Sequence, residues 1–587
     1  MTSKRGAWWR VLALLAALGI FAAACGSDSD SGDSASSTTE TTQAESEEPD
    51  EPPATTDEAN YGGSITIGME AESNTWTPGE GNFASSGTTV ALAIYDPLVS
   101  INAEGDFEGF LAESLEPNDD LTEWTLKLRP DIKFHDGSDL NAEVVKWNFD
   151  TLHNNDSRQT FGTLQIAGVT GMDIVDDLTV VYHLSETNAA FPDLLRGQIG
   201  WPVSKEAYEA NPDGFGSHPV GTGPFEVVEW RRDDRMVTKR NENYWFTAAN
   251  GDQLPYLDEV IFRPIPDEDS RVQSLAAGSV QMTQTLRGSA IKATQELERT
   301  GNIDVLLYAG NESNTAIFNM LVPPVDDVRV RKALVMATDS YTVQEVLGDD
   351  GLVNPSSGFF SPDSPWYSSK VADAYPTDGT RNVEGAKELI EEYRADPNRS
   401  DGRNPGDPID VEYNCPPDPS LLQVAQLQQG FWAEINVNTK LNQVEQGPHI
   451  ENAVGSADQE PPFKGNYMIN CWRTGGGTGD PITSLQTYFG PIATTPGNVF
   501  NYVDPEIDEA LHTLKTSADF TERYAAVEKI GIITSEQVPV LWVSPTATAI
   551  GYVNNIRGID DWTLPSGERG NGNPSAIIRT HQLFLAN

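Results

Sequence analysis

The stretch Pro219-Val220-Gly221-Thr222-Gly223-Pro224-Phe225 is the segment from which the architecture of this chain can be worked out. Its two glycines and the proline that follows them are typical of a tight bend, because glycine accepts backbone conformations that other residues avoid. The segment therefore predicts a sharp turn that leads into a strand. His135-Asp136-Gly137 predicts a second turn, in which glycine permits a positive φ angle.

Strand-like and helix-like segments alternate along much of the chain around that bend. Alternating apolar residues predict strands at 64–68, 124–128, 180–184, 410–414, 436–441 and 467–471. Helical periodicity predicts helices at 142–152, at 328–337, around 424–431, and from a capping box at Asp519 and Glu522 through Glu536. Strands interleaved with helices favour α/β lobes with largely parallel sheets, in which ligands bind beyond the carboxyl ends of the strands. Asn414-Cys415 and Cys471-Trp472 follow such strand ends, so we expect a cleft there.

The N-terminal segment, residues 1–24, has the pattern of an export signal: basic residues, a short apolar run at 11–21 and small residues at 22–24. The run is too short to form a permanent membrane helix. Cys25 follows the small residues as in a bacterial lipobox, although Ala22 stands where leucine is usual, and we expect Cys25 to be lipidated. An ordinary secretory signal with a chance cysteine is the alternative. Residues 25–60 predict a disordered acidic tether between the anchor and the folded body.

Composition bounds the classes of function that remain. The 587 residues carry a formal net charge of −50, which argues against nucleic acid as a partner and favours a solvated acidic surface. The body is too long for one hydrophobic core, so at least two lobes are expected. The sequence contains no Gly-x-Ser-x-Gly elbow, no P-loop and no metal-ligand spacing of histidines or cysteines. We therefore expect no enzymatic activity, no cofactor and no metal.

Two cysteines remain after Cys25, namely Cys415 and Cys471. In an exported protein such a pair is compatible with a disulfide. Neighbouring strands lie roughly 4.8 Å apart, which is within the range of Cα separations that a disulfide spans. Two buried thiols are the alternative.

Further motifs accompany the bend in a fixed order along the whole body. They are 94–99, 124–129, 134–137, 142–145, 219–225, 241–245, 256–260, 327–333, 504–508 and Pro539. Together they resemble the family-5 extracellular solute-binding proteins, the oligopeptide- and dipeptide-binding components of ABC importers. Most of these motifs are interpreted as scaffold, and we expect Arg329 and Arg331 to pair with carboxylates or to cap a loop.

The resemblance implies an α/β, two-lobed periplasmic-binding-protein fold with an extra domain inserted in the first lobe. We expect lobe one at 61–98, 217–310 and 541–587, the inserted domain at 99–216 and lobe two at 311–540, with hinge crossings near Ala309 and Val540. The implied function is that of a monomer outside the cytoplasmic membrane, which captures a small solute, peptide-like or other, in an interlobe cleft. Its implied partner is an ABC permease and ATPase complex. A cell-envelope hydrolase and a signalling lipoprotein that reuses the fold are the alternatives.

In the peptide-binding members, a second-lobe strand ends in a tryptophan followed by an aspartate that holds the ammonium group of the peptide. Here Arg473 follows Trp472, and Gly477 stands three places before the acid-proline pair Asp480-Pro481, where that aspartate is expected. A buried ammonium without a carboxylate is costly, so free-amine peptides are predicted to bind weakly unless Asp480 takes over this role. The expected ligand contacts, each with core packing or a purely structural role as the alternative, are Trp76, Asn319, Phe359, Tyr413, Asn414, Trp472, Arg473 and Asp480.

Overall fold

The computed structural model describes residues 59–586 with short gaps at 82, 156–157, 159, 161–162, 165–166, 363, 418, 455–464, 477–478 and 492–497. These residues belong to one compact unit that covers 57–587. The predicted export signal, Cys25, most of the tether and Gly477 lie outside the described residues. Within the described part of the chain, no helix combines the length and the apolar character that a membrane crossing requires.

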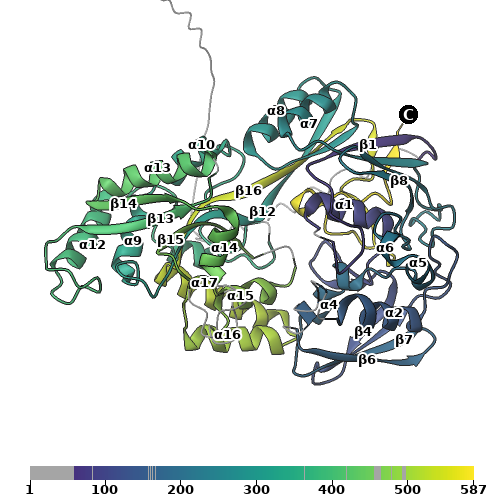
Figure 1. Ribbon diagram of the computed structural model, residues 1–587, viewed down its shortest axis with the longest axis horizontal. Helices are drawn as coiled ribbons and strands as arrows, with labels where there is room; N and C mark the ends of the chain where they lie inside the picture. Colours follow the sequence, from purple (N-terminus) through teal and green to yellow (C-terminus); the bar gives the residue numbers. More distant parts are fainter. Residues whose placement is uncertain are drawn as a thin grey trace, which may run out of the picture. The chain divides into compact units, whose positions relative to one another are not determined.

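A ten-stranded sheet runs through the molecule (Figure 1). Its strands, in spatial order, are β14 (Val437–Gln443), β13 (Ile409–Cys415), β15 (Ile469–Gly475), β12 (Ile303–Phe318), β16 (Val540–Val553), β11 (Met282–Thr285), β1 (Ser64–Met69), β10 (Glu259–Pro264), β9 (Arg235–Arg240) and β8 (Phe225–Arg231). The pairings β13–β14, β13–β15, β1–β10 and β1–β11 are parallel, and the others are antiparallel. The expectation of largely parallel sheets was therefore wrong, because the two long central strands, β12 and β16, run in opposite directions.

A separate sheet forms the core of the inserted domain. It is antiparallel throughout, in the order β4 (Ala112–Pro117), β5 (Glu123–Leu128), β7 (Thr179–Leu184) and β6 (Val169–Asp176). The hairpin of β2 (Val99–Ile101) and β3 (Phe107–Gly109) leads into it. The described helical segments of this part are α2 (Ala142–Asn148) with a π-turn at Phe149–His153, α4 (Phe191–Leu194), a 3₁₀ turn at Gln198–Gly200, α5 (Lys205–Ala210) and α6 (Pro212–Phe215).

Helices lie against the large sheet on both sides of its central strands (Figure 1). Near the N-terminal strands these are α1 (Ser85–Ile94), α7 (Glu268–Ala276) and α8 (Gly288–Glu298). The second lobe contains α9 (Val328–Ala337), α10 (Ser340–Leu347), α11 (Ser369–Ala374), α12 (Val383–Ala395), α13 (Pro419–Ala433), α14 (Gln446–Val454), α15 (Pro481–Phe489), α16 (Pro505–Thr516) and α17 (Phe520–Gln537). Asp519 caps α17 by accepting a hydrogen bond from the Glu522 amide, which confirms the helix start that the sequence predicts.

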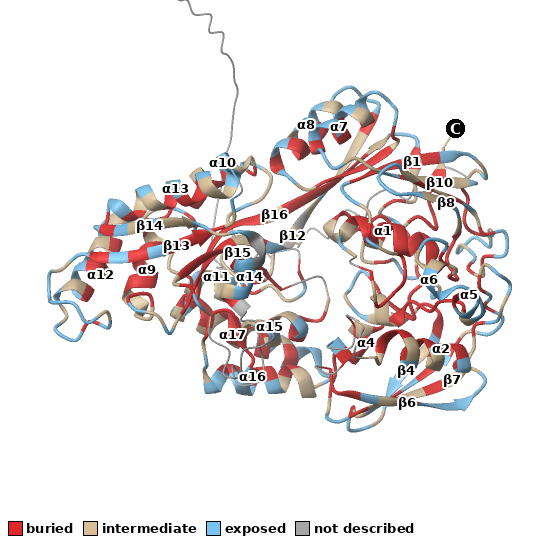
Figure 2. Cartoon of the chain, viewed as in Figure 1, coloured by how far each residue is buried: buried red, intermediate tan, exposed pale blue. Residues whose placement is uncertain are grey.

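Three large hydrophobic clusters correspond to three packed bodies, and β16 is buried along most of its length (Figure 2). One cluster draws mainly on residues 316–543, a second mainly on 65–95, 201–262 and 550–583, and a third on 98–195. The chain thus has two lobes with an inserted domain, which is the fold that the family resemblance implies. β12 and β16 pair with each other from Ile303 opposite Val553 to Ile317 opposite Val540.

The Pro219–Phe225 bend docks onto the end of α1. The Gly223 amide donates to the Ile94 carbonyl at 2.9 Å, and a Cβ atom at Gly221 or Gly223 would collide with the Ile94 backbone. The His135 amide donates to the Gly221 carbonyl at 2.9 Å, and His135 Nε2 lies 2.9 Å from the Gly223 carbonyl oxygen. The two predicted turns therefore meet where the inserted domain joins lobe one, and only glycine fits the closest approach.

Asp96 lies buried at the same junction, with 3% of its surface exposed. Its carboxylate accepts hydrogen bonds from Tyr244 Oη at 2.8 Å, Trp245 Nε1 at 2.9 Å and Thr222 Oγ1 at 3.1 Å. Burial raises the pKa of Asp96 to about 6, against the opposing effect of these hydrogen bonds and of Arg579. Three motifs that are far apart in the sequence thus converge on one carboxyl group.

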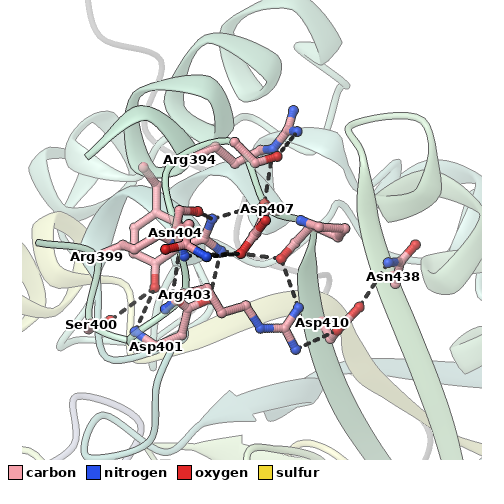
Figure 3. A network of polar contacts seen from close by, with 12 residues as sticks. Arg394, Arg399, Ser400, Asp401, Arg403, Asn404, Asp407, Asp410 and Asn438 are labelled. Atoms are coloured by element: carbon pink, nitrogen blue, oxygen red, sulfur yellow. Dashed lines mark hydrogen bonds and ion pairs between the residues drawn. The ribbon is translucent and has the colours of Figure 1, made fainter. Parts of the chain in front are cut away.

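Charged networks organise the loops of lobe two (Figure 3). Arg399, 3% exposed, forms a bidentate pair with Asp401 and donates to the carbonyls of Asp407 and Pro408 ahead of β13. Arg329 pairs with two carboxylates, whereas the buried Arg331 donates to backbone carbonyls. Both family-motif arginines are therefore scaffold, as the sequence predicts.

Candidate functional site

A cavity of about 960 Å³ lies where the lobes and the inserted domain meet. The β2–β3 hairpin forms one wall, and the lobe-two segments 361–366, 479–480 and 518–523 form the facing wall. Tyr308 on β12 and Pro574 near the C-terminus close the third side. A cavity of this size accommodates a small solute and suits a binding site.

Aromatic side chains supply much of the lobe-two wall. Phe520 is the first residue of α17 and is 52% exposed although its ring is large and apolar. Its ring centroid lies 5.0 Å from that of Trp366, and both residues line the cavity. The Arg523 guanidinium lies over the Trp366 ring, 5.5 Å from the ring centroid. An exposed aromatic ring beside a cavity is typical of a ligand-binding surface.

Asp480 lines the cavity and caps α15, but it is not free to bind an ammonium group. Its two oxygens both accept from Arg523 Nη2, at 2.7 and 2.5 Å, and Oδ1 also accepts from the Ile482 amide. The side chain is almost fully buried, and burial raises the pKa of Asp480 although Arg523 opposes this. Arg523 thus already compensates the charge of Asp480 within the protein. This ion pair conflicts with the prediction that Asp480 replaces the missing aspartate as the anchor of a ligand ammonium group.

The hairpin wall carries three acids, Glu104, Asp106 and Glu108. Glu108 accepts from Asn102 Nδ2 at 3.1 Å and from Ser566 Oγ at 2.6 Å, and burial raises its pKa. Glu104 and Asp106 are exposed, and within the described residues their carboxylates have no hydrogen-bond or ion-pair partner. The hairpin therefore presents two uncompensated negative charges at the cavity.

The inserted domain also contacts lobe two beside the cavity. The Ala189 amide donates to the Lys515 carbonyl at 2.8 Å, and Lys515 Nζ pairs with Glu186. Gly479 lies so close to the Asp193 carboxylate that a Cβ atom would collide with it. These contacts join the inserted domain to lobe two.

Four of the residues expected at the site lie in packed cores and do not line this cavity. Trp76 (1% exposed) packs against Trp230, and Phe359 (4%) packs against Trp542. Tyr413 (1%) donates to Gln428, and Asn319 (1%) donates its amide to two backbone carbonyls. Their neighbours come from distant parts of the chain, so local sequence could not reveal this burial.

Three further expected residues lie on the neighbouring strands β13 and β15, also away from the cavity lining. Asn414 accepts from Asn442 Nδ2 at 2.9 Å, and the half-buried Trp472 packs beside the His449 ring at 5.9 Å. Arg473 is exposed, and no hydrogen-bond or ion-pair partner of its side chain occurs in the described part of the chain. The structure therefore brings Asp480 alone of the eight predicted contacts to the lining of the large cavity.

Cys415 and Cys471 form a disulfide between the parallel strands β13 and β15, with Cα atoms 4.9 Å apart. Both cysteines are buried in the lobe-two cluster. Cys415 is the last residue of β13, as predicted, but the predicted strand end at Cys471 was wrong, because β15 continues to Gly475. The bond therefore ties the end of β13 to the interior of β15.

Sequence reasoning missed the hairpin and the Trp366–Phe520 wall. One usable signal was Phe520, a large apolar residue directly after the helix cap Asp519. The hairpin had a weaker signal, namely the acids Glu104, Asp106 and Glu108 around the turn at Gly105.

Comparisons with known proteins identify the family and the fold of this chain. The family model "Bacterial extracellular solute-binding proteins, family 5 Middle" matches residues 106–495. The chain belongs to the family-5 bacterial extracellular solute-binding proteins, whose location is outside the cytoplasmic membrane. Relatives such as GsiB and structural neighbours such as DppA from Helicobacter pylori are named as binding proteins.

Individual relatives are distant but cover nearly the whole body. The glutathione-binding protein GsiB of Escherichia coli O157:H7 is 25% identical over 511 residues, which are 85% of this chain and 92% of GsiB. HbpA2 from Haemophilus parasuis has a TM-score of 0.73 at 20% identity, over 89% of this chain and 100% of HbpA2. The dipeptide binding protein of Pseudoalteromonas sp. SM9913 in complex with Met-Leu has a TM-score of 0.67 at 20% identity, over 89% and 100% of the two chains. These two structures show the shared two-lobed fold.

Proposed function

We propose that this protein captures a small peptide-like solute in the cavity between its lobes and delivers it to an ABC permease and ATPase complex. The cavity of about 960 Å³, with its exposed Phe520 wall, is the observation that carries the proposal. Relatives named for glutathione and for a dipeptide support a peptide-like solute. The role is that of a carrier without catalysis, acting as a monomer.

Domain closure is the proposed mode of capture, as in hinged binding proteins. The two chain crossings run through β12 and β16, and the register of this pair shifts between Ala309 and Ser313 and again between Asn314 and Thr315. A register shift breaks the regular hydrogen bonding of a sheet and concentrates bending there. We propose this irregularity as the hinge between lobe one (61–98, 217–310, 541–587) with its inserted domain (99–216) and lobe two (311–540).

A lipid anchor on Cys25 is proposed to hold the protein at the outer face of the cytoplasmic membrane. The supporting observations are the small residues before Cys25 and the acidic, polar tether after it. Cys25→Ser should release the protein into the medium or leave it unprocessed. Unchanged membrane fractionation of this variant would refute the anchor.

Mass spectrometry of ligand released from the purified and denatured protein tests the carrier role. We expect a small peptide-like molecule at near-stoichiometric amount from the native protein. Phe520→Ala should reduce this amount severalfold. Tyr341→Ala, which removes a similarly exposed aromatic ring on α10 away from the cavity, should not. Equal recovery from both variants would contradict the assignment of the cavity, and turnover of a released solute would contradict a carrier without catalysis.

A further inference from the structure

The charges that line the cavity select a class of solute. The described lining contains one cation, Arg523, and its charge is compensated by Asp480 through two short hydrogen bonds. The acids Glu104 and Asp106 on the facing hairpin have no such compensation within the described residues. The remaining charge at the cavity is therefore negative.

The hairpin that carries these acids is held in place by its own contacts. The Asp106 amide donates to Asn102 Oδ1 at 2.8 Å, and Asn102 Nδ2 donates to Glu108 at 3.1 Å and to Glu568 at 2.9 Å. The Ala103 amide donates to the Arg569 carbonyl at 2.9 Å, which ties the turn to the C-terminal segment. The two carboxylates therefore extend from a fixed turn rather than from an unsupported loop.

The opposite wall complements these acids. Phe520 and Trp366 expose aromatic rings to the same cavity, and an aromatic face attracts a cation through its quadrupole. Arg523, stacked on Trp366, shows that a guanidinium is already accepted at this wall. A solute that carries an ammonium or guanidinium group on an apolar stem suits this cavity. The carboxylates of the hairpin attract its positive charge, and the aromatic rings of the lobe-two wall contact the cation and the apolar stem.

From these observations we propose that the cavity binds a cationic solute, a peptide with a lysine- or arginine-like side chain, and discriminates against acidic peptides such as glutathione. The inference rests on the proposed function and specifies its substrate class. It separates this chain from the relatives that are named for glutathione, which carries more carboxylates than ammonium groups.

Isothermal titration calorimetry with matched tripeptides tests this proposal on the full mature protein, freed of endogenous ligand. The probes are Ala-Lys-Ala, the same peptide with Nε-acetyl-lysine, Ala-Glu-Ala and reduced glutathione. We expect Ala-Lys-Ala to bind about tenfold more tightly than its acetylated form, a size typical of two partly exposed ion pairs with a cation–π contact. Ala-Glu-Ala and glutathione should bind more weakly still, and the preference should shrink at high salt.

The variant Glu104→Gln/Asp106→Asn should bind the lysine and acetyl-lysine peptides with affinities within about twofold of each other, as expected after the loss of two weak ion pairs. Glu388→Gln/Glu392→Gln is the matched control, because it removes two exposed acids on α12 that do not line the cavity. This control should retain the full preference. Circular dichroism of both variants checks that they fold.

The outcomes separate the two proposals. Equal affinities for all tripeptides, or tightest binding of glutathione, would overturn the cationic class and leave the peptide carrier intact. A preference that survives Glu104→Gln/Asp106→Asn would also overturn it. If no peptide binds but spermidine binds to the native protein and not to Glu104→Gln/Asp106→Asn, the proposal of a peptide carrier is refuted and the proposal of a cationic solute is supported. Failure of spermidine as well would overturn both.

Discussion

Replacing Asp96 with asparagine tests the account of the junction between lobe one and the inserted domain. Asp96 is buried, and burial raises its pKa from 3.8 to about 6 even though Tyr244, Trp245 and Thr222 donate hydrogen bonds to it. The Arg579 guanidinium lowers the pKa of Asp96. Burial, and to a smaller extent Asp96, raises the pKa of the Tyr244 phenol, which therefore donates its hydrogen bond as a neutral group.

The size of the effect follows from this shift. A difference of about two pKa units corresponds to about 3 kcal/mol between the ionised and neutral forms. The folded pKa lies above the unfolded one, so between about pH 4 and pH 6 the folded state holds a proton that the unfolded state has lost. The contribution of Asp96 to the free energy of unfolding is therefore complete below about pH 4 and is lost as the pH rises through 6.

Asp96→Asn should remove this pH dependence without breaking the junction. The asparagine oxygen can accept from Trp245 and Thr222, whose bonds both end on Oδ2, and its amide can donate to the Tyr244 hydroxyl, which then acts as an acceptor. Between pH 4 and pH 7 the native protein should lose about 3 kcal/mol of unfolding free energy relative to Asp96→Asn. The variant should therefore gain in relative stability as the pH rises to 7.

Urea unfolding followed by tryptophan fluorescence at half-unit pH steps measures this difference. Asp119→Asn, at an exposed position of the inserted domain, is the control and should track the native protein at every pH. Parallel pH profiles for the native protein and Asp96→Asn would show that Asp96 titrates as an ordinary surface acid and would refute the reasoning.

Three further predictions address the scaffold around the site. Gly221→Ala should lower the yield of folded protein sharply, because the added methyl group collides with backbone, and a native-like melting temperature would contradict this. Arg523→Met should lower the free energy of unfolding by about 3–5 kcal/mol because it leaves Asp480 buried and unpaired, and adding Asp480→Asn should recover much of the loss. Cys415→Ala together with Cys471→Ala should cost about 2–4 kcal/mol, and the denatured, unreduced native protein should show no reactive thiol from these two positions.

Much of the local structure follows from the sequence because its causes lie within a few residues. The capping box at Asp519 predicts the start of α17, and the periodicity of Val330, Leu334 and Ala337 predicts α9, which spans Val328–Ala337. Glycine at 137 predicts a positive φ angle, and the structure has φ of 85° there. Caps, periodicity and turn chemistry act over one or two turns of chain, so short windows of sequence contain them.

The site could not be predicted in the same way. Whether Trp76 lines a cleft or packs in a core depends on Trp230 and Phe83, and these neighbours are set by sheet order rather than by the residues beside Trp76. The same holds for Asp480. Its carboxylate suits an amine when the sequence is considered alone, but in the structure it binds Arg523, which lies on another helix.

The sequence by itself determined the family, the two-lobed plan, the main helices and strands, and the turns at 135–137 and 219–225. These features depend on residues that act over a few positions or on motifs that follow one another in a fixed order. The tertiary structure decided the antiparallel centre of the sheet, the disulfide pairing and the cavity walls. The cavity joins a hairpin near residue 104, lobe-two segments near 366 and 520, and a tail near 574, which come together through long-range packing of the lobes. Such packing depends on the burial of apolar surface from the whole chain, and no local window of sequence contains that information.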